Sequence, residues 1–211
     1  MDENKKWFIE ERAKRAVEAL KKNGISAYYV EDAEAARRKV LELVDPKESI
    51  GFGGSMTLGE LGILPLLEER GNRLITRLEA LGAERLRQRR EALHCDTFLT
   101  STNALTEDGR LVNIDGTANR VASMVFGPKK VVVIAGYNKL VSNLEEALKR
   151  AREVAAPMNA KRLKVKTPCT TTGVCSDCRS ADRICNVTTI IDRKPGAVDM
   201  YVVVVGDSLG Y

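Results

Sequence analysis

Hydrophobic and polar positions alternate between helical and extended patterns from the start of the chain. Residues 3–22 place apolar side chains at helical spacing among Lys, Arg and Glu, and Gly24 follows as a stop signal. A β-like run over 25–30 comes next, and then a helical segment over about 33–44 that Asp32 can cap. The opening of the chain therefore predicts a helix, a strand and a second helix.

The alternation continues to the end of the chain. Val-Val-Val-Ile-Ala within 130–135 is apolar on both faces, as a central parallel strand should be, and Asp108-Gly109 favours a hairpin. Further strands are expected at 49–52, 74–76, 96–100, 111–114 and 200–205, and further helices up to about 70, at 83–93, at 118–126 and at 143–155, the last ending before Pro157. The pattern predicts one α/β domain over 1–211, with a helical segment at 1–24 and a Rossmann-like, mainly parallel sheet flanked by helices.

Composition limits the classes of function. Of the 211 residues, 44% are hydrophobic and 30% charged, which is enough for both a core and a solvated surface. The net charge of +5 is spread over mixed-sign helical faces and only 5% of residues are aromatic, so no nucleic-acid partner is expected. Neither a signal-peptide pattern nor a run of membrane-spanning length is present in the sequence, so we expect a cytoplasmic protein without a membrane partner. Whether the protein forms a homo-oligomer stays an open question at this point.

Four of the five cysteines lie within 17 residues, in a polar segment that cannot form a core. Cytoplasmic thiols are kept reduced, and thiolates select zinc, copper(I) or iron–sulfur centres. Only one Cys-x2-Cys pair is present, whereas zinc ribbons use two, so the compact and uneven spacing favours one iron–sulfur cluster, of the 4Fe-4S type. Zinc and unmetallated thiols remain the alternatives. The expected metal ligands, on an inserted loop over 157–195, are Cys169, Cys175, Cys178 and Cys185.

Basic residues flank this segment, and they have two interpretations. They can offset the negative charge of a four-thiolate cluster, or they can simply form a solvated face. These residues are Lys161, Arg162, Lys164, Lys166, Arg179 and Arg183. The fifth cysteine, Cys95, precedes a predicted strand and is expected to be a core thiol.

A glycine-rich turn follows the strand expected at 49–52. Backbone N–H groups and two hydroxyls at the start of a helix can bind a phosphate or a carboxylate, although a purely structural turn is the alternative. Met56 stands at the third glycine position of the dinucleotide fingerprint, and Glu60 stands where a Walker motif has lysine, so neither motif is present. The predicted ligand-binding residues of this turn are Gly51, Gly53, Gly54, Ser55, Met56 and Thr57.

Polar residues also mark strand ends and helix starts between 101 and 139, where open α/β sheets bind ligands. Asp115 or Asp108 could act as a general base, and Lys139 or Arg120 could hold a substrate anion. We therefore predict Asp115 and Lys139 as catalytic residues. The predicted substrate-binding residues of this region are Asn103, Asn119, Arg120 and Asn138.

Three stretches resemble the LUD domain of lactate-utilization proteins. They are Ser-Ile-Gly-Phe-Gly-Gly-Ser-Met-Thr-Leu at 49–58, the run from Thr-Ser-Thr-Asn to Asn-Arg-Val-Ala at 100–122, and Ala-Pro-Met-Asn-Ala-Lys-Arg at 156–162 with the cysteine motif from residue 168. The broader resemblance is to the ribose-5-phosphate isomerase and CoA-transferase superfamily, which binds anionic small molecules. The isomerases carry an Asp-Gly-Ala-Asp strip, but the second acid is lost here, where Asn119 stands four residues after Asp115.

This resemblance implies a subunit of an iron–sulfur system that oxidises L-lactate to pyruvate, with a redox partner protein. Two catalytic alternatives stay open: an oxidoreductase subunit, or a cluster-assisted enzyme on a small anionic metabolite. The non-catalytic alternative is a metabolite or redox sensor whose metal is structural. A zinc-dependent nucleic-acid binder is disfavoured by the low aromatic content.

Overall fold

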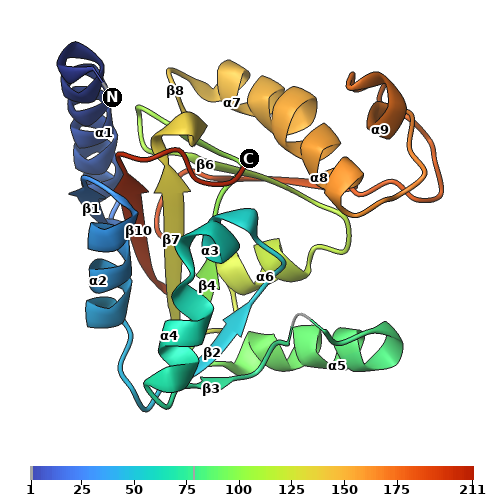
Figure 1. The fold of residues 1–211 in the computed structure, drawn as a ribbon, viewed down its shortest axis with the longest axis horizontal. Helices are drawn as coiled ribbons and strands as arrows, with labels where there is room; N and C mark the ends of the chain where they lie inside the picture. The colour runs from blue at the N-terminus through green and yellow to red at the C-terminus, as the bar shows by residue number, and fades with distance from the viewer. Residues whose placement is uncertain (1, 78) are drawn as a thin grey trace.

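A six-stranded parallel sheet lies at the centre of the computed structural model, which describes residues 2–77 and 79–211 (Figure 1). Each neighbouring pair of strands is parallel, in the order β1-β10-β7-β4-β2-β3. The strands are β1 (Ser26–Val30), β2 (Ser49–Phe52), β3 (Arg73–Leu74), β4 (Thr97–Thr100), β7 (Lys130–Gly136) and β10 (Asp199–Val205). The predicted Rossmann-like sheet is confirmed, whereas Met1 of the predicted 1–24 segment lies outside the described residues.

The central strand β7 is buried on both faces because helices cover both. Val131 and Val133 pack into one apolar cluster with α1, and Val132 and Ile134 pack into another with α2, α3 and α4. This alternation follows from the two-residue period of a strand. The helices are α1 (Glu3–Lys22), α2 (Ala33–Leu43), α3 (Met56–Leu61), α4 (Ile63–Glu69), α5 (Gly82–Glu91), α6 (Asn119–Val125), α7 (Leu144–Arg150), α8 (Ala156–Arg162) and α9 (Cys169–Thr172).

A second, four-stranded sheet packs beside the first, and the sequence predicted only half of it. Its order is β8-β5-β6-β9, with β8 at Leu140–Val141, β5 at Ala104–Thr106, β6 at Leu111–Asp115 and β9 at Val187–Ile191. The expected hairpin at Asp108-Gly109 joins β5 to β6, and Gly109 adopts a φ of +83° there. Strand β9 pairs with β6 over a separation of more than 70 residues, which no local pattern reveals.

The helix expected to end before Pro157 instead continues through it. A π-helical segment, Ala151–Ala155, joins α7 to α8, and Pro157 falls in the first turn of α8. Proline is tolerated in a first turn because an N–H group is dispensable there. The inserted loop is consequently shorter than the predicted 157–195, since α8 occupies its start and β9 its end.

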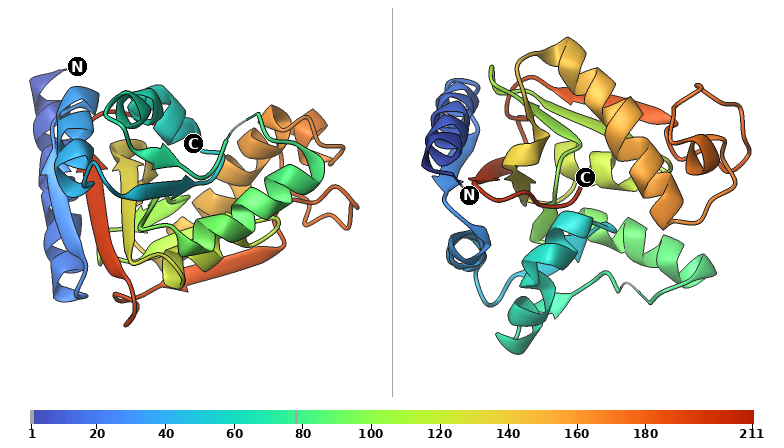
Figure 2. Two further views of the ribbon diagram at one scale, coloured as in Figure 1. Left: turned by 90° about the horizontal axis from the view of Figure 1, so that it is seen from below. Right: turned by 45° about the horizontal axis from the view of Figure 1, so that its top comes forward.

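The arrangement places three loops together at the carboxyl ends of β2, β4 and β7. Figure 2 shows the C-terminal end of the chain beside α3 and α8, on this side of the molecule. The segment that carries the four cysteines and α9 follows the C-terminal end of α8 and lies on the right in Figure 1. Within the described residues, no helix is long and apolar enough to cross a membrane.

Candidate functional site

A polar pocket lies where the carboxyl ends of β2, β4 and β7 meet. It is an open cavity of ≈ 520 Å³. Eight of the predicted catalytic and substrate-binding residues line it: Gly54, Ser55, Met56, Thr57, Asn103, Asp115, Arg120 and Lys139. The strand order creates this site, because the first turn of α3 meets the residues that follow β4 and β7.

Lys139 is the cation at the floor of the pocket. Its side chain is 2% exposed, and its Nζ donates to the Thr57 Oγ1 at 2.7 Å and to the Ser101 Oγ at 2.8 Å. Burial, together with the charges of Arg150 and Arg120, lowers the pKa of Lys139 to about 7. An ammonium has three protons, so one donor remains for a ligand.

Arg120 is held by the protein on all sides. Its Nε donates to the Asp115 Oδ1 at 3.0 Å, and its two terminal nitrogens donate to the Ser101, Asn103, Asn113 and Ile114 oxygens. The Asp115 Oδ2 accepts the Val121 N–H at 2.9 Å. Arg120 and Asp115 therefore stabilise the wall of the pocket, and the polar atoms of both side chains are hydrogen-bonded within the protein.

The other predicted residues lie around the pocket or away from it. Asp108 stays in the β5–β6 turn, where its carboxylate accepts from the Thr106 hydroxyl and pairs with Arg110. Gly51 packs inside β2, because a Cβ there would lie 2.8 Å from the Cys95 Sγ. Gly53 follows β2 without lining the cavity, and Asn119 accepts from the Thr117 hydroxyl.

Asn138 acts on the pocket indirectly, through the C-terminal segment. Its Oδ1 accepts from the Leu209 N–H at 3.1 Å, and its Nδ2 donates to the Gly210 oxygen at 2.8 Å. The Gly210 N–H also donates to the Glu60 Oε2 at 2.7 Å. These contacts carry Tyr211 into the pocket lining.

Sequence reasoning missed five lining residues. Ser101 and Thr102 follow β4, so the end of that predicted strand was a usable signal. Ile114 is an apolar residue of the predicted hairpin. Asn159 and Tyr211 reach the pocket only through the packing of α8 and of the last residues, which leaves no local mark in the sequence.

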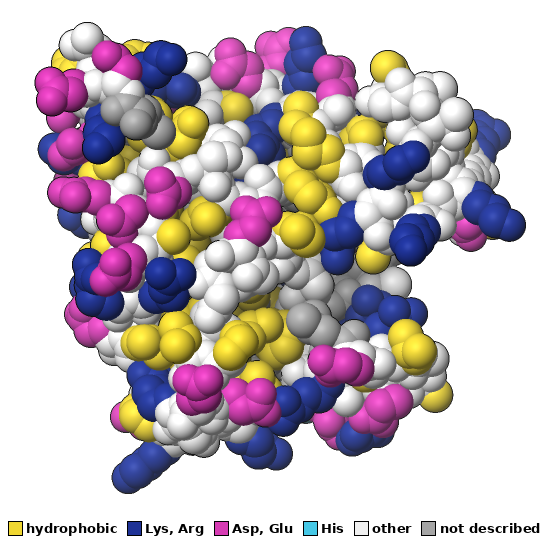
Figure 3. All heavy atoms as spheres, in the orientation of Figure 1, with side chains coloured by type: hydrophobic (Ala, Val, Ile, Leu, Met, Phe, Trp, Pro, Cys, Tyr) yellow, Lys and Arg dark blue, Asp and Glu magenta, His cyan; other side chains and the backbone are white. Residues whose placement is uncertain are grey.

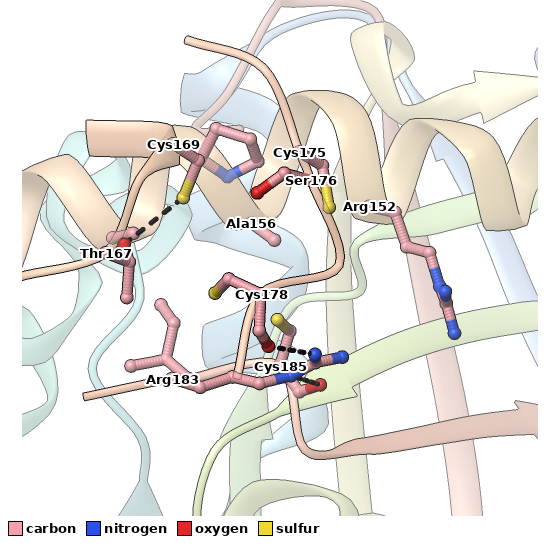
Figure 4. A pocket seen from close by; sticks show the side chains of 12 residues that line it. Arg152, Ala156, Thr167, Cys169, Cys175, Ser176, Cys178, Arg183 and Cys185 are labelled. Atoms are coloured by element: carbon pink, nitrogen blue, oxygen red, sulfur yellow. Dashed lines mark hydrogen bonds between the residues drawn. The ribbon is translucent and has the colours of Figure 1, made fainter. Parts of the chain in front are cut away.

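The four clustered cysteines line a second, small cavity (Figure 4). All four are free thiols and half-buried. Burial raises the pKa of the Cys185 thiol, although the charge of Arg183 opposes this. The cavity floor is the apolar side of α8, formed by Ala156, Pro157 and Ala160.

The spacing of these thiols differs from a single-ion site. Zinc needs sulfurs about 2.3 Å from one ion. In the described part of the chain, no three Cys, His, Asp or Glu side chains are grouped closely enough to hold a metal ion. A 4Fe-4S cluster takes one thiolate per iron, so its four ligands spread around a larger space. Four thiols around one cavity match this donor set without showing a metal centre.

Arg183 ties the cysteine segment together. It donates to the Cys178 oxygen and, through Nε, to the Cys185 oxygen at 3.1 Å (Figure 4). It also donates to the Asp177 Oδ1 at 2.8 Å. The Asp177 carboxylate raises the pKa of Arg183, as do the thiols. A single guanidinium thus fixes the backbone at two of the cysteines.

The two cavities share a wall. Asn159 of α8 lines the polar pocket, whereas Ala156 and Ala160 of the same helix line the cysteine cavity. At the end of β6, the Asp115 oxygen accepts the Asn186 N–H at 2.9 Å, directly after Cys185. Asn159 and Ala160 are neighbours in α8, so a change at one cavity can reach the other through a single residue.

The fold and the pocket define the class of this molecule: a Rossmann-like α/β protein with a polar cavity at the carboxyl ends of its parallel strands. Within that class, the chain belongs to the LUD domain family, whose model matches residues 13–205. The predicted family membership is thereby confirmed.

A solved structure and the curated proteins complete the comparison. A crystal structure of a DUF162 family protein from Deinococcus radiodurans is similar, with a TM-score of 0.55 and 11% identity over 93% of this chain and 98% of that one. At this identity the likeness supports the fold alone. No curated protein matches the chain.

Proposed function

We propose that this protein binds a small organic acid beside Lys139, holds an iron–sulfur cluster on its four cysteines, and serves in the oxidation of that acid. Family membership supports a role in lactate utilization, which makes L-lactate the first candidate. The observation that carries the proposal is the buried Lys139 ammonium, whose two neighbours are neutral hydroxyls. A carboxylate ligand would supply the missing counter-charge.

Lys139 is the better of the two predicted catalytic residues. Because its pKa is about 7, part of the population carries a neutral amine at neutral pH. A neutral amine can accept the proton of a 2-hydroxyl group, and the ammonium can hold the resulting oxygen. Asp115 is engaged by Arg120 and by a backbone N–H, so its role is to keep Arg120 in place.

The ligand type of the cysteine cavity supports the proposed cluster. Cys169, Cys175, Cys178 and Cys185 would hold it, and a bound cluster supplies one-electron redox chemistry. The chain itself contributes the apolar floor, which excludes water, and Arg183, which fixes the segment. Because α8 lines both cavities, the substrate would lie on the other side of one helix.

A non-catalytic sensor is the second candidate. It is favoured by the complete engagement of Asp115 and Arg120, whose carboxylate and guanidinium are both held by the protein. The residues at 115–119 also lack the second acid of the isomerase strip. A sensor would bind the acid and would not turn it over.

One experiment separates these candidates. The anaerobically purified protein is analysed for iron and sulfide, and is then assayed with L-lactate and an artificial dye acceptor that takes the two electrons. Thermal shifts with L-lactate, pyruvate and inorganic phosphate are measured in parallel. Turnover that is lost in Lys139→Met supports the enzyme. Ligand-induced stabilisation without turnover supports the sensor.

A matched control keeps this test sharp. Lys129→Met removes a lysine that is 86% exposed, far along β7 from the pocket, and should change neither binding nor turnover. Failure of all three anions to stabilise the wild-type protein would contradict the proposed pocket. Absence of iron and sulfide in the anaerobic preparation would contradict the proposed cluster.

A further inference from the structure

The basic residues of this protein are distributed unevenly once ion pairs are considered. Several lysines and arginines of α1, α2 and α5 pair with a carboxylate one turn away, as Lys14 does with Glu10, Arg38 with Glu34 and Arg87 with Glu91. Between residues 157 and 186, the described structure contains a single ion pair, Arg183–Asp177. This segment carries a net charge of +4 out of the chain's +5.

The unpaired cations lie on the segment that carries the four cysteines. Lys164, Lys166 and Arg179 are exposed, and their side chains make no hydrogen bond or ion pair within the described residues. Lys161 donates to the Thr170 backbone oxygen at 3.0 Å, and Arg162 donates to the Asn159 Oδ1. Figure 3 shows dark blue side chains gathered on the right-hand side, over the cysteine segment.

Apolar side chains are exposed on the same segment. Val174 is 67% exposed, Met158 49% and Leu163 47%. Val174 directly precedes Cys175, and the other two belong to α8 and to its end, beside the cysteine cavity. Small apolar contacts inside a ring of charge are typical of transient protein–protein interfaces, where the charge steers the encounter.

From these observations we propose that residues 157–186 form a docking surface for an acidic electron-carrier protein. This inference rests on the proposed cluster, because the carrier would exchange its electron with a cluster held in the cysteine cavity. The carrier would gain or lose one electron while the cluster does the reverse. The contact would be weak and fast, since exposed charges steer the encounter more than they hold the complex.

A protein fits this surface better than a nucleic acid does. Residues 157–186 contain neither an aromatic residue nor a histidine, so bases have no stacking platform. The exposed apolar side chains would contribute nothing to phosphate binding, whereas they can pack against a protein. Charge complementarity then requires an acidic partner.

The test uses a bacterial ferredoxin of acidic surface as the probe, immobilised on a biosensor, with the anaerobic protein as analyte. The on-rate should fall at least about ten-fold between 50 and 300 mM NaCl, because steering is screened by salt. The variant Lys164→Glu/Lys166→Glu/Arg179→Glu should lower the on-rate by a further factor of about ten or more. Its melting temperature and its iron and sulfide content should match the wild type.

A second triple variant controls for net charge. Lys6→Glu/Lys22→Glu/Lys47→Glu changes the charge by the same amount at exposed positions on α1 and after α2. Its on-rate should stay within about three-fold of the wild type, since steering depends on local rather than total charge. An equal loss in both triple variants would overturn the docking surface.

Two further outcomes are decisive. Tighter binding to a DNA duplex than to the ferredoxin would overturn the choice of a protein partner. Absence of ferredoxin binding by a preparation that contains iron and sulfide would overturn the docking surface while leaving the proposed function intact. Absence of iron and sulfide, in contrast, would overturn the proposed function and with it the electron carrier.

Discussion

Lys139 and Thr57 are 82 residues apart in the chain, yet the Lys139 Nζ donates to the Thr57 Oγ1 at 2.7 Å. The contact joins the turn after β7 to the first turn of α3, and Ser101 after β4 completes it. Three neighbouring strands of a parallel sheet thus deliver one side chain each to the same point. The pocket is a direct result of the strand order.

The stability of the protein should depend on pH through Lys139. The pKa of this lysine is lowered in the folded state to about 7 from 10.5, so between these values the unfolded chain binds more protons. Stability contributed by this group therefore rises with pH from about 7 upward and is constant below it. Relative to Lys139→Met, the wild type should gain about 1 kcal/mol per pH unit between pH 7.5 and 9.5.

Urea unfolding of both proteins at several pH values measures this difference. Other groups titrate equally in the two proteins, so the difference isolates Lys139. A wild-type to variant difference that stays flat above pH 7 would show that the lysine keeps its ordinary pKa. It would then be solvated, and the buried cation would lose its part in the proposed function.

Substitution of two nearby glycines should have opposite effects. A Cβ at Gly51 would lie 2.8 Å from the Cys95 Sγ and 3.0 Å from the Ala92 Cβ, so Gly51→Ala should destabilise the protein by about 1–3 kcal/mol. A Cβ at Gly59 meets nothing within 4 Å, and this residue lies inside α3. Gly59→Ala should stabilise the protein by about 0.5–1 kcal/mol.

Chemical denaturation of the two variants checks the sign of each change. Cys95→Ala combined with Gly51→Ala should recover part of the lost stability, because it removes the closest atom. Equal effects of Gly51→Ala and Gly59→Ala on stability would contradict the packing of Gly51 against Cys95. The predicted role of Gly51 as a ligand-binding residue would then regain support.

Much of the fold was predictable because its signals are local. The helix at Glu3–Lys22 and the strand at Ser49–Phe52 have the bounds expected from the sequence. Asp32 caps α2 as expected, with its carboxylate accepting from the Ala35 N–H at 2.8 Å. Caps, stop signals and two-face burial depend only on neighbouring residues, so they survive in the sequence.

The missed elements depend on distant partners. Strand β9 forms because it pairs with β6, which is distant in the sequence. The helix that was expected to end before Pro157 continues because a π-helical segment precedes this proline. The pocket shows the same division. Lys139 and Thr57 follow clear strand signals, whereas Tyr211 reaches the cavity through the contacts of Asn138 and Glu60 with the residues before it. Tertiary contacts of this kind leave no pattern within a short window of sequence.

Replacing Arg120 by lysine should be costly although it conserves the charge. The guanidinium donates to Asp115, Asn103 and Asn113 and to two backbone oxygens, which one ammonium cannot reach together. The acceptors left unsatisfied should lower the free energy of unfolding by about 2–4 kcal/mol. Arg85→Lys on the exposed face of α5 is the control, and urea unfolding should show it unchanged.

The final prediction concerns Arg183, which fixes the backbone at Cys178 and Cys185. Arg183→Lys keeps the charge but cannot donate to both cysteine oxygens and to Asp177 at once. We expect the segment to loosen, so that anaerobic reconstitution leaves less than about half of the wild-type iron and sulfide after desalting, because loss of a residue that orients the metal ligands weakens metal binding. The melting temperature should change little, because the segment lies outside the main core.

In the metal-free protein, alkylation of Cys178 and Cys185, followed by mass spectrometry, should be faster in Arg183→Lys than in Arg179→Lys, which alters an exposed neighbour without such contacts. Equal alkylation rates would mean that Arg183 does not order the thiols, and the cluster would then have to impose its own geometry on the loop.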